Sequence, residues 1–219
     1  MSGVGRLRDG NYTAKVLASG LIRRLPQSNP IDAKLKPIQS TALKKLHSRA
    51  CNIRSIRLKK DFRLKSFFRL FNLYFFRGFL GNQINFKWAE VRPNQPTWSG
   101  RAILQADARG HQSVLIRIRR PSKEHWGETT VQEVLATLLV EMVNAMFLLH
   151  ACDCPSCLGI GQELSKAKLI AALEEEANRS LTSFTKPWQL QDPFGDKTLS
   201  FQQQQKFTTQ ASNGIEERE

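Results

Sequence analysis

One histidine and three cysteines lie within a single short segment, and these are side chains with which proteins bind zinc. The cluster consists of His150, Cys152, Cys154 and Cys157. The Cys-x-x-Cys spacing at 154 and 157 is a recurring half of a tetrahedral zinc site, and Cys152 or His150 would supply a third ligand. The cluster is a candidate structural zinc site. The alternative is a loop of reduced intracellular thiols, because strong zinc signatures combine two ligand pairs from separate segments.

Basic side chains interleaved with phenylalanine are a second feature with a chemical use. Between Arg54 and Arg77, cations are spaced to bind phosphate groups and rings to stack on unpaired bases. The candidate nucleic-acid-binding residues are Arg54, Arg57, Lys59, Lys60, Arg63 and Lys65. No base-reading motif is visible, so we expect binding to DNA or chromatin to be nonspecific and salt-sensitive. The alternatives are a solubilising tail and a nuclear import signal.

The distribution of charge separates an N-terminal region from the rest of the chain. The 219 residues carry 33 Lys and Arg against 19 Asp and Glu, a net charge of +14. Residues 1–70 hold 17 basic and 3 acidic side chains, whereas residues 71–219 hold 16 of each. We predict that residues 1–63 are a basic, partly disordered arm in which no helical period is sustained. A mitochondrial transit peptide is the alternative, against which the acidic Asp9 argues.

The remaining pattern predicts a small α+β domain over residues 64–180, followed by a disordered polar tail over 181–219. A helix with an aromatic face begins at Leu64, and Gly78 or Gly81 would end it. The expected elements after it are strands Ile84–Val91, Arg101–Gln105 and Ser113–Arg119, a turn at Asp107–His111, and helices Val131–His150 and Glu163–Ser180. Thr130 and Glu133 have the spacing of a capping box.

The segment Val134–Cys152 is long and apolar enough to suggest a membrane span. Glu141 and Asn144 lie at its centre, where hydrocarbon would make both side chains costly. A central helix buried in protein is the more economical interpretation. No signal peptide is apparent, and we expect an intracellular protein without a membrane partner.

The order of these elements and several residues within them resemble the SprT-like family of zinc metalloproteases. The resemblance rests on Leu70-Phe71-Asn72-x-Tyr74-Phe75-Phe76-x-Gly78-x-Leu80, on a strand with Trp88, on Ser99-Gly100 before a hairpin, and on the string TLLVEMVNA over 137–145. It covers residues 66–157. It implies a zincin-like domain with an aromatic opening helix, a three-stranded mostly antiparallel sheet and a long metal helix. One branch of the family degrades proteins crosslinked to DNA, which implies a nuclear, DNA-associated protein.

The metal helix of that family carries His-Glu-x-x-His, in which two imidazoles bind zinc and the glutamate acts as general base. In this chain the corresponding positions are Val140, Glu141 and Asn144. Valine has no donor atom, and an amide oxygen suits hard cations better than zinc. No histidine follows Gly161 as the third ligand that the family would supply. The resemblance implies that Glu141 is a remnant of the general base, paired with Asn144 one turn away or with water.

The sequence predicts a protein that has lost zinc-dependent proteolysis and acts as a non-catalytic binding or regulatory module. We expect no cofactor at the former catalytic site and a nuclear location, with cytoplasm or mitochondrion as alternatives. A competing hypothesis is an active zinc metallopeptidase of the DNA–protein crosslink repair type with non-standard ligands, such as His150 and the cysteine cluster. A third is the product of a decaying or misassembled gene.

Overall fold

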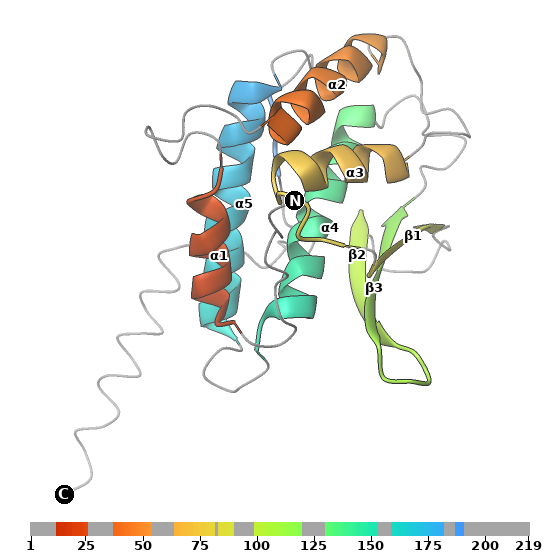
Figure 1. Ribbon diagram of the computed structural model, residues 1–219, viewed down its shortest axis with the longest axis vertical. Helices are drawn as coiled ribbons and strands as arrows, with labels where there is room; N and C mark the ends of the chain where they lie inside the picture. Colours follow the sequence, from red (N-terminus) through yellow and green to blue (C-terminus); the bar gives the residue numbers. More distant parts are fainter. Residues whose placement is uncertain are drawn as a thin grey trace, which may run out of the picture.

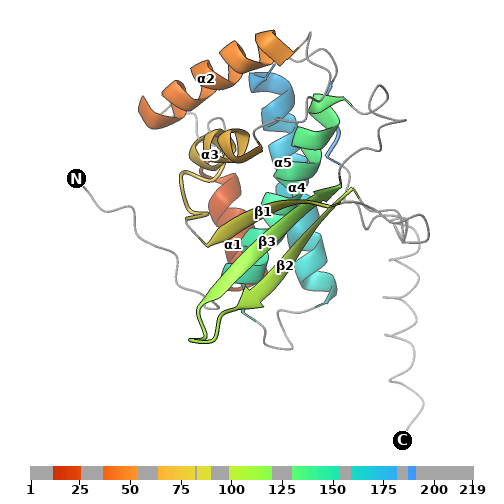
Figure 2. The ribbon, with the colours of Figure 1, turned by 90° about the vertical axis from the view of Figure 1, so that its right-hand side faces the viewer.

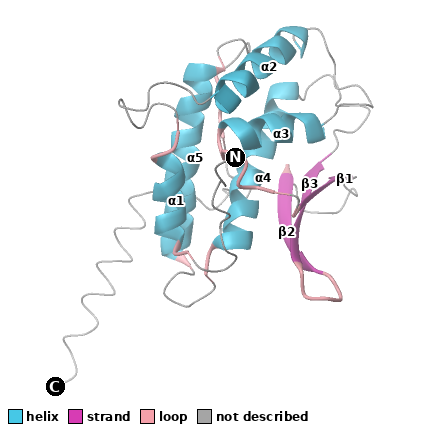
Figure 3. Ribbon diagram, viewed as in Figure 1, coloured by secondary structure: helices cyan, strands magenta, loops and turns pink. Residues whose placement is uncertain are grey.

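Five helices and a three-stranded sheet form the described part of the chain (Figures 1 and 3). The computed structural model describes residues 12–25, 37–53, 64–81, 83–89, 99–119, 130–152, 159–181 and 187–190. The elements are α1 (Ala14–Ile22), α2 (Pro37–Ile53), α3 (Leu64–Tyr74), β1 (Ile84–Ala89), β2 (Gly100–Ala106), β3 (Gln112–Arg119), α4 (Val131–His150) and α5 (Ile160–Ser180). Helix α1 packs on α5, α4 packs on the sheet, and α2 lies against α3. The predicted α+β class is confirmed.

The sheet is mixed, with the strand order β1-β3-β2. Strand β3 runs antiparallel to β2 and parallel to β1. The prediction of a mostly antiparallel sheet is therefore wrong for one of the two pairings. A short turn forces β2 and β3 to be antiparallel, whereas the longer connection after β1 leaves the direction of that strand open.

The predicted turn at Asp107–His111 joins β2 to β3. Asp107 Oδ1 accepts hydrogen bonds from the backbone N–H of Arg109 at 2.8 Å and of His111 at 2.9 Å. Gly110 has a φ of 78°, in the left-handed region that favours glycine. The hydrogen bonds from the backbone and then the side chain of His111 lower the pKa of Asp107. The turn thus holds its aspartate as an ionised acceptor.

Helix α4 has the bounds predicted for the central helix, and the capping box at its start is confirmed. Thr130 Oγ1 accepts from the backbone N–H of Glu133 at 3.2 Å, and Glu133 Oε2 accepts from the Thr130 N–H at 2.7 Å. By length and composition α4 could cross a membrane, but 78% of its most apolar window is buried inside the protein. That burial agrees with the predicted central core helix.

Helix α3 buries its aromatic face, as predicted, but ends at Tyr74, before Gly78 and Gly81. Gly78 has a φ of 82°, and its N–H donates to the Asn72 carbonyl at 2.8 Å. The Asn72 side chain donates to the Leu80 carbonyl and accepts from the Leu80 N–H. The segment after the helix is therefore a hydrogen-bonded turn, and Gly78 serves that turn.

Helices α1 and α2 lie in the region where we predict no sustained helix, and that prediction is wrong for their residues. In α1, Ala14, Leu17, Ala18 and Leu21 recur at steps of three and four residues and are buried. Ala42 and Leu46 of α2 are buried as well. Most helical stability in proteins comes from packing such a face against a core, which the basic composition of this region did not indicate. The rest of residues 1–63 lies outside the described ranges.

The chain after α5 also contributes to the core. Helix α5 begins at Ile160, earlier than the predicted Glu163, and ends at Ser180 as predicted. Trp188 and Leu190 are buried, although they lie in the segment that we predict as a disordered tail. The backbone N–H of Trp188 donates to Asn178 Oδ1 at 2.6 Å, and Asn178 Nδ2 donates to the Trp188 carbonyl at 3.1 Å. Residues 191–219 lie outside the described ranges.

Candidate functional site

Glu141 lies where α4 meets the beginning of β2. Its side chain is fully buried. A Cβ atom placed on Gly100 would lie 2.8 Å from Glu141 Cγ and 2.6 Å from Thr137 Cγ2, closer than such atoms normally approach. Glycine at position 100 is therefore what allows the strand to come this near to the helix. The strand covers the carboxyl-bearing side chain at this point.

The two positions flanking Glu141 in the degenerate metal motif differ in their surroundings. Val140 is fully buried and provides no donor atom. Asn144 is half-buried, and its Nδ2 donates to Glu141 Oε2 at 3.3 Å. The predicted pairing of Glu141 with the asparagine one turn away is confirmed. In the described part of the chain, no group of three or more His, Cys, Asp or Glu side chains is placed to hold a metal ion.

The predicted zinc cluster is only partly within the described residues. His150 is the last residue of α4 and is buried, and Cys152 is half-buried. The N-terminal segment lies alongside them: the Tyr12 N–H donates to the His150 carbonyl at 3.2 Å, and the Cys152 N–H donates to the Tyr12 carbonyl at 2.9 Å. Cys154 and Cys157 lie outside the described residues. The zinc site stays a prediction.

Most of the predicted nucleic-acid-binding residues also lie outside the described ranges, namely Arg54, Arg57, Lys59, Lys60 and Arg63. Lys65 is exposed on α3. The α3 rings expected to stack on bases, Phe67, Phe68 and Phe71, are buried in the core. The Arg49 guanidinium lies over the Phe67 ring, 5.7 Å from its centre. These rings stabilise the fold and are not available to bases.

The sheet carries cations that sequence analysis did not single out. Lys87 on β1, Arg101 on β2 and Arg117 and Arg119 on β3 occupy alternate positions that face away from α4, and we call them the sheet-face cations. The alternation of polar and apolar residues in β1 was visible in the sequence. Their alignment with one another depends on strand order and register, which the sequence did not reveal.

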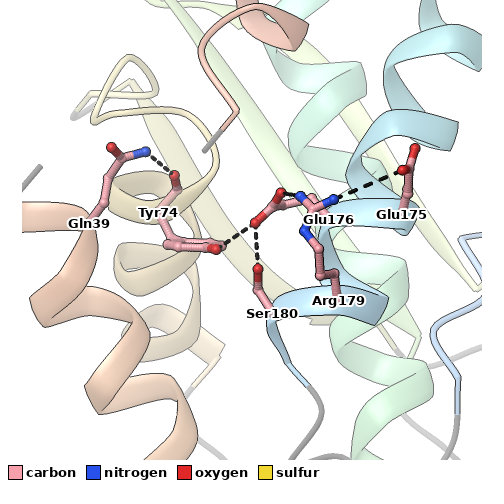
Figure 4. A network of polar contacts seen from close by, with 6 residues as sticks. All are labelled: Gln39, Tyr74, Glu175, Glu176, Arg179 and Ser180. Atoms are coloured by element: carbon pink, nitrogen blue, oxygen red, sulfur yellow. Dashed lines mark hydrogen bonds and ion pairs between the residues drawn. The ribbon is translucent and has the colours of Figure 1, made fainter. Parts of the chain in front are cut away.

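A buried polar network joins α2, α3 and α5 (Figure 4). Glu176 Oε1 accepts from the Tyr74 hydroxyl at 2.6 Å and from the Ser180 hydroxyl at 2.5 Å, while Arg179 forms an ion pair with Glu176 Oε2. Gln39 Nε2 donates to the Tyr74 carbonyl at 2.9 Å. Burial raises the pKa of Tyr74, and the Ser180 hydrogen bond and the Arg179 charge act in the opposite direction. The network holds three helices together.

Comparisons of the chain with protein-family models, with curated proteins and with solved structures find no match. The SprT-like resemblance therefore rests on residues of this chain alone.

Proposed function

We propose that the chain is a non-catalytic relative of the SprT-like metalloproteases and acts as a binding or regulatory module. The observation that supports this most directly is the condition of the motif on α4. Val140 offers no ligand, Glu141 is fully buried, and the Asn144 amide donates to the Glu141 carboxylate. A catalytic zinc site needs three protein ligands and an open position for water. This helix provides neither around Glu141.

The close approach at Gly100 adds a steric argument. A single methyl group on Gly100 would collide with Thr137 and Glu141. A substrate peptide is far larger than a methyl group, so it has no room to reach the fully buried Glu141 from the side of Gly100. General-base catalysis requires the base within hydrogen-bond reach of the proton that it removes, either directly or through one water.

The binding part of the proposal is association with DNA or chromatin in the nucleus, in the context of DNA–protein crosslink repair. It is supported by the resemblance and by the charge of the chain, because residues 1–70 carry 17 basic and 3 acidic side chains. Binding that relies on phosphate contacts is sequence-independent and weakens steeply with salt.

Proteolysis is tested with the purified full chain, duplex DNA and a histone-like substrate, with and without added zinc. We expect no cleavage by the wild type or by Glu141→Gln in either condition. An active SprT-like protease assayed in parallel shows that the conditions permit cleavage. Zinc-dependent cleavage by the wild type that Glu141→Gln abolishes would overturn the proposal and favour a peptidase with non-standard ligands.

DNA association is tested by fluorescence anisotropy at about 50 and 200 mM salt, a range over which phosphate-mediated binding weakens by orders of magnitude. We expect binding at the lower concentration and strong weakening at the higher one. The absence of binding at about 50 mM would remove the DNA component.

A structural zinc at His150, Cys152, Cys154 and Cys157 remains part of the proposal, separate from catalysis. Metal analysis of protein purified without chelator tests it, with Cys154→Ser/Cys157→Ser as the comparison. We expect near-stoichiometric zinc in the wild type and its loss in the variant. Less than about half an equivalent in the wild type would count against the site.

A further inference from the structure

Strand β2 lies at one border of the sheet, next to β3 (Figure 2). Two hydrogen bonds define which of its residues face β3. The Arg119 N–H donates to the Ser99 carbonyl at 2.9 Å, and the Asp107 N–H donates to the His111 carbonyl at 3.1 Å. Ser99 and Asp107 are an even number of residues apart, and an antiparallel ladder bonds every second residue. The odd-numbered residues of β2 therefore direct their backbone groups to β3.

The even-numbered residues Ala102, Leu104 and Ala106 direct their N–H and C=O groups to the opposite side, and we call them the free edge. In the described part of the chain, no hydrogen bond joins the backbone of these residues to another strand or loop. Leu104 is 38% exposed, although it pairs with the fully buried Val114 and so points to the α4 side of the sheet. Ala106 is exposed and Ala102 is half-buried. The free edge thus combines unpaired backbone groups with an accessible leucine.

Strand β2 lacks several features that keep sheet edges from pairing. Natural edge strands are often very short, or they carry proline, lysine or a bulge. Strand β2 has seven residues, contains neither proline nor lysine, and keeps an unbroken register with β3. Its one charged residue, Arg101, lies near the beginning of the strand. Such an edge is suited to the addition of another strand, which would bind through main-chain hydrogen bonds.

The free edge is complementary to itself in an antiparallel register centred on Leu104. In this register Leu104 lies opposite Leu104 of a second copy, and Ala102 lies opposite Ala106. All of these positions then form hydrogen-bonded pairs, because each has its backbone groups on the free side. The two leucines meet on the α4 side of the extended sheet, where each removes apolar surface of the other from water.

The same register brings opposite charges together. Arg101 lies opposite Asp107 of the second copy, on the face away from α4. Arg101 is exposed, and the Asp107 side chain is 53% exposed. Opposite charges directly across antiparallel strands stabilise the pairing, and a two-fold axis repeats the ion pair. A register centred on Ile103 would place Arg101 opposite Gln105 and would need the backbone of the buried Gly100.

We propose that two copies of the chain join through β2 in the register centred on Leu104 and form one continuous sheet. The pairing requires neither DNA nor zinc, so it is independent of the proposed function. A contact centred on one strand pair is small, and we expect mostly monomer at about 1 µM and mostly dimer at about 100 µM. Each copy uses the same edge, so the contact closes at the dimer.

Sedimentation velocity of the full chain over this concentration range tests the pairing. Leu104→Lys should remain monomeric throughout, because it places like charges opposite each other at the centre of the contact. Leu148→Lys on α4 is the matched control, because Leu148 is 37% exposed and lies outside the strands. It should dimerise like the wild type.

Folding of both variants is checked by thermal unfolding followed by circular dichroism. Leu104→Pro is a second variant, because it removes an N–H that β3 does not use. It should also be monomeric.

The ion pair is tested with Asp107→Asn, which keeps the side-chain oxygen that accepts from the Arg109 and His111 N–H groups. Asp107→Asn and Arg101→Gln should each weaken the dimer about two- to tenfold. The double variant should be no weaker than either single one, because both substitutions remove the same interaction. Additive effects would contradict the contact between these two side chains.

The register is tested by mild oxidation of cysteine variants. Ile103 lies opposite Gln105 of the second copy, so a mixture of Ile103→Cys and Gln105→Cys should form a disulfide-linked dimer, which mass spectrometry locates. Cross-linking of Ile103→Cys alone, without cross-linking in the mixture, would exclude the proposed register.

Two further results would overturn the inference. A wild type that stays monomeric at about 100 µM would do so and leave the proposed function untouched. A dimer that persists in folded Leu104→Lys and Leu104→Pro would locate the contact elsewhere on the molecule.

Discussion

At Gly100 the sheet comes so near to α4 that a hydrogen atom is the largest side chain that fits. The atoms that a Cβ would meet belong to Thr137 and Glu141, one turn apart on the helix. One glycine thereby determines how closely β2 covers the carboxyl-bearing side chain. The residue that covers the site is as important to its accessibility as the residues of the motif.

Gly100→Ala is expected to destabilise the protein by about 1–3 kcal/mol, because the added methyl group overpacks the contact between β2 and α4. Denaturant unfolding monitored by circular dichroism measures the change. Gly20→Ala is the matched control, because Gly20 lies in α1 with nothing within 4 Å of the added methyl. A helical Gly→Ala change should be neutral or stabilising by up to about 1 kcal/mol. Equal stability of Gly100→Ala and the wild type would refute the steric argument.

Some residue contacts could be predicted from the sequence and others could not. The pair Glu141–Asn144 follows from helical spacing, because residues three apart lie on the same helix face. The glycine contact and the row Lys87–Arg117–Arg101 join residues that are distant in the chain. They depend on how the elements pack and on the register of the strands, for which a single sequence carries no direct signal.

Among the elements, α4 was predicted to the residue because local signals mark both ends of it. The capping box defines its beginning, and its apolar composition is sustained up to His150. The three strands were predicted nearly within their observed bounds, and the alternation of polar and apolar residues was the signal for β1. The direction of β1 and the presence of helix α1 were not predicted, because both depend on tertiary contacts.

The capping box gives the second prediction. Thr130→Ala removes the side-chain acceptor for the Glu133 N–H and should cost about 0.5–2 kcal/mol in the free energy of unfolding. Thr130→Ser, which keeps the hydroxyl, should lie close to the wild type. Thermal unfolding of the three proteins at neutral pH makes the comparison. An alanine variant as stable as the serine variant would mean that the cap contributes nothing.

The polar network that joins α2, α3 and α5 should make the free energy of unfolding decrease at alkaline pH. Burial raises the pKa of Tyr74 above its ordinary value of 10.0. The phenol is therefore neutral in the folded state at pH values where the unfolded chain already ionises it. Its contribution to stability is complete below about pH 10 and is lost as the pH rises through the folded pKa.

Tyr74→Phe should remove this alkaline loss, while at pH 7 it costs about 1–3 kcal/mol because Glu176 loses a hydrogen-bond donor. Unfolding midpoints measured from about pH 7 to 11 separate the two effects. Tyr12→Phe is the control, because it leaves Tyr74 as the only tyrosine and lets absorbance report its ionisation directly. If the Tyr74 phenol ionises at or below its ordinary pKa in that variant, the buried network is not formed as described.

For the whole molecule, the main difference from the sequence prediction is that residues before 64 belong to the core. Helix α1 packs on α5 and also contacts α4. Trp188 and Leu190 extend the core beyond position 181. Composition suggested a boundary because the charge changes there, but apolar residues at helical spacing inside a basic region are enough to bury one helix face.

Two neighbouring residues of α1 test this arrangement. Leu17 is 4% exposed and Val16 is 52% exposed. Leu17→Ala should cost about 2–5 kcal/mol in unfolding free energy, whereas Val16→Ala should change it by no more than about 0.5 kcal/mol. Urea unfolding of both variants measures the difference. If residues 1–63 were an arm separate from the core, both substitutions would leave stability unchanged.

The bridge between Tyr12 and Ala151 has a consequence for folding during synthesis on the ribosome. The first partner leaves the exit tunnel about 140 residues ahead of the second, which at 5–20 residues per second is a delay of roughly 7–28 s. During that interval the leucines of α1 have no α5 to cover them. The nascent chain should therefore expose the apolar face of α1 to chaperones until synthesis is well past its midpoint.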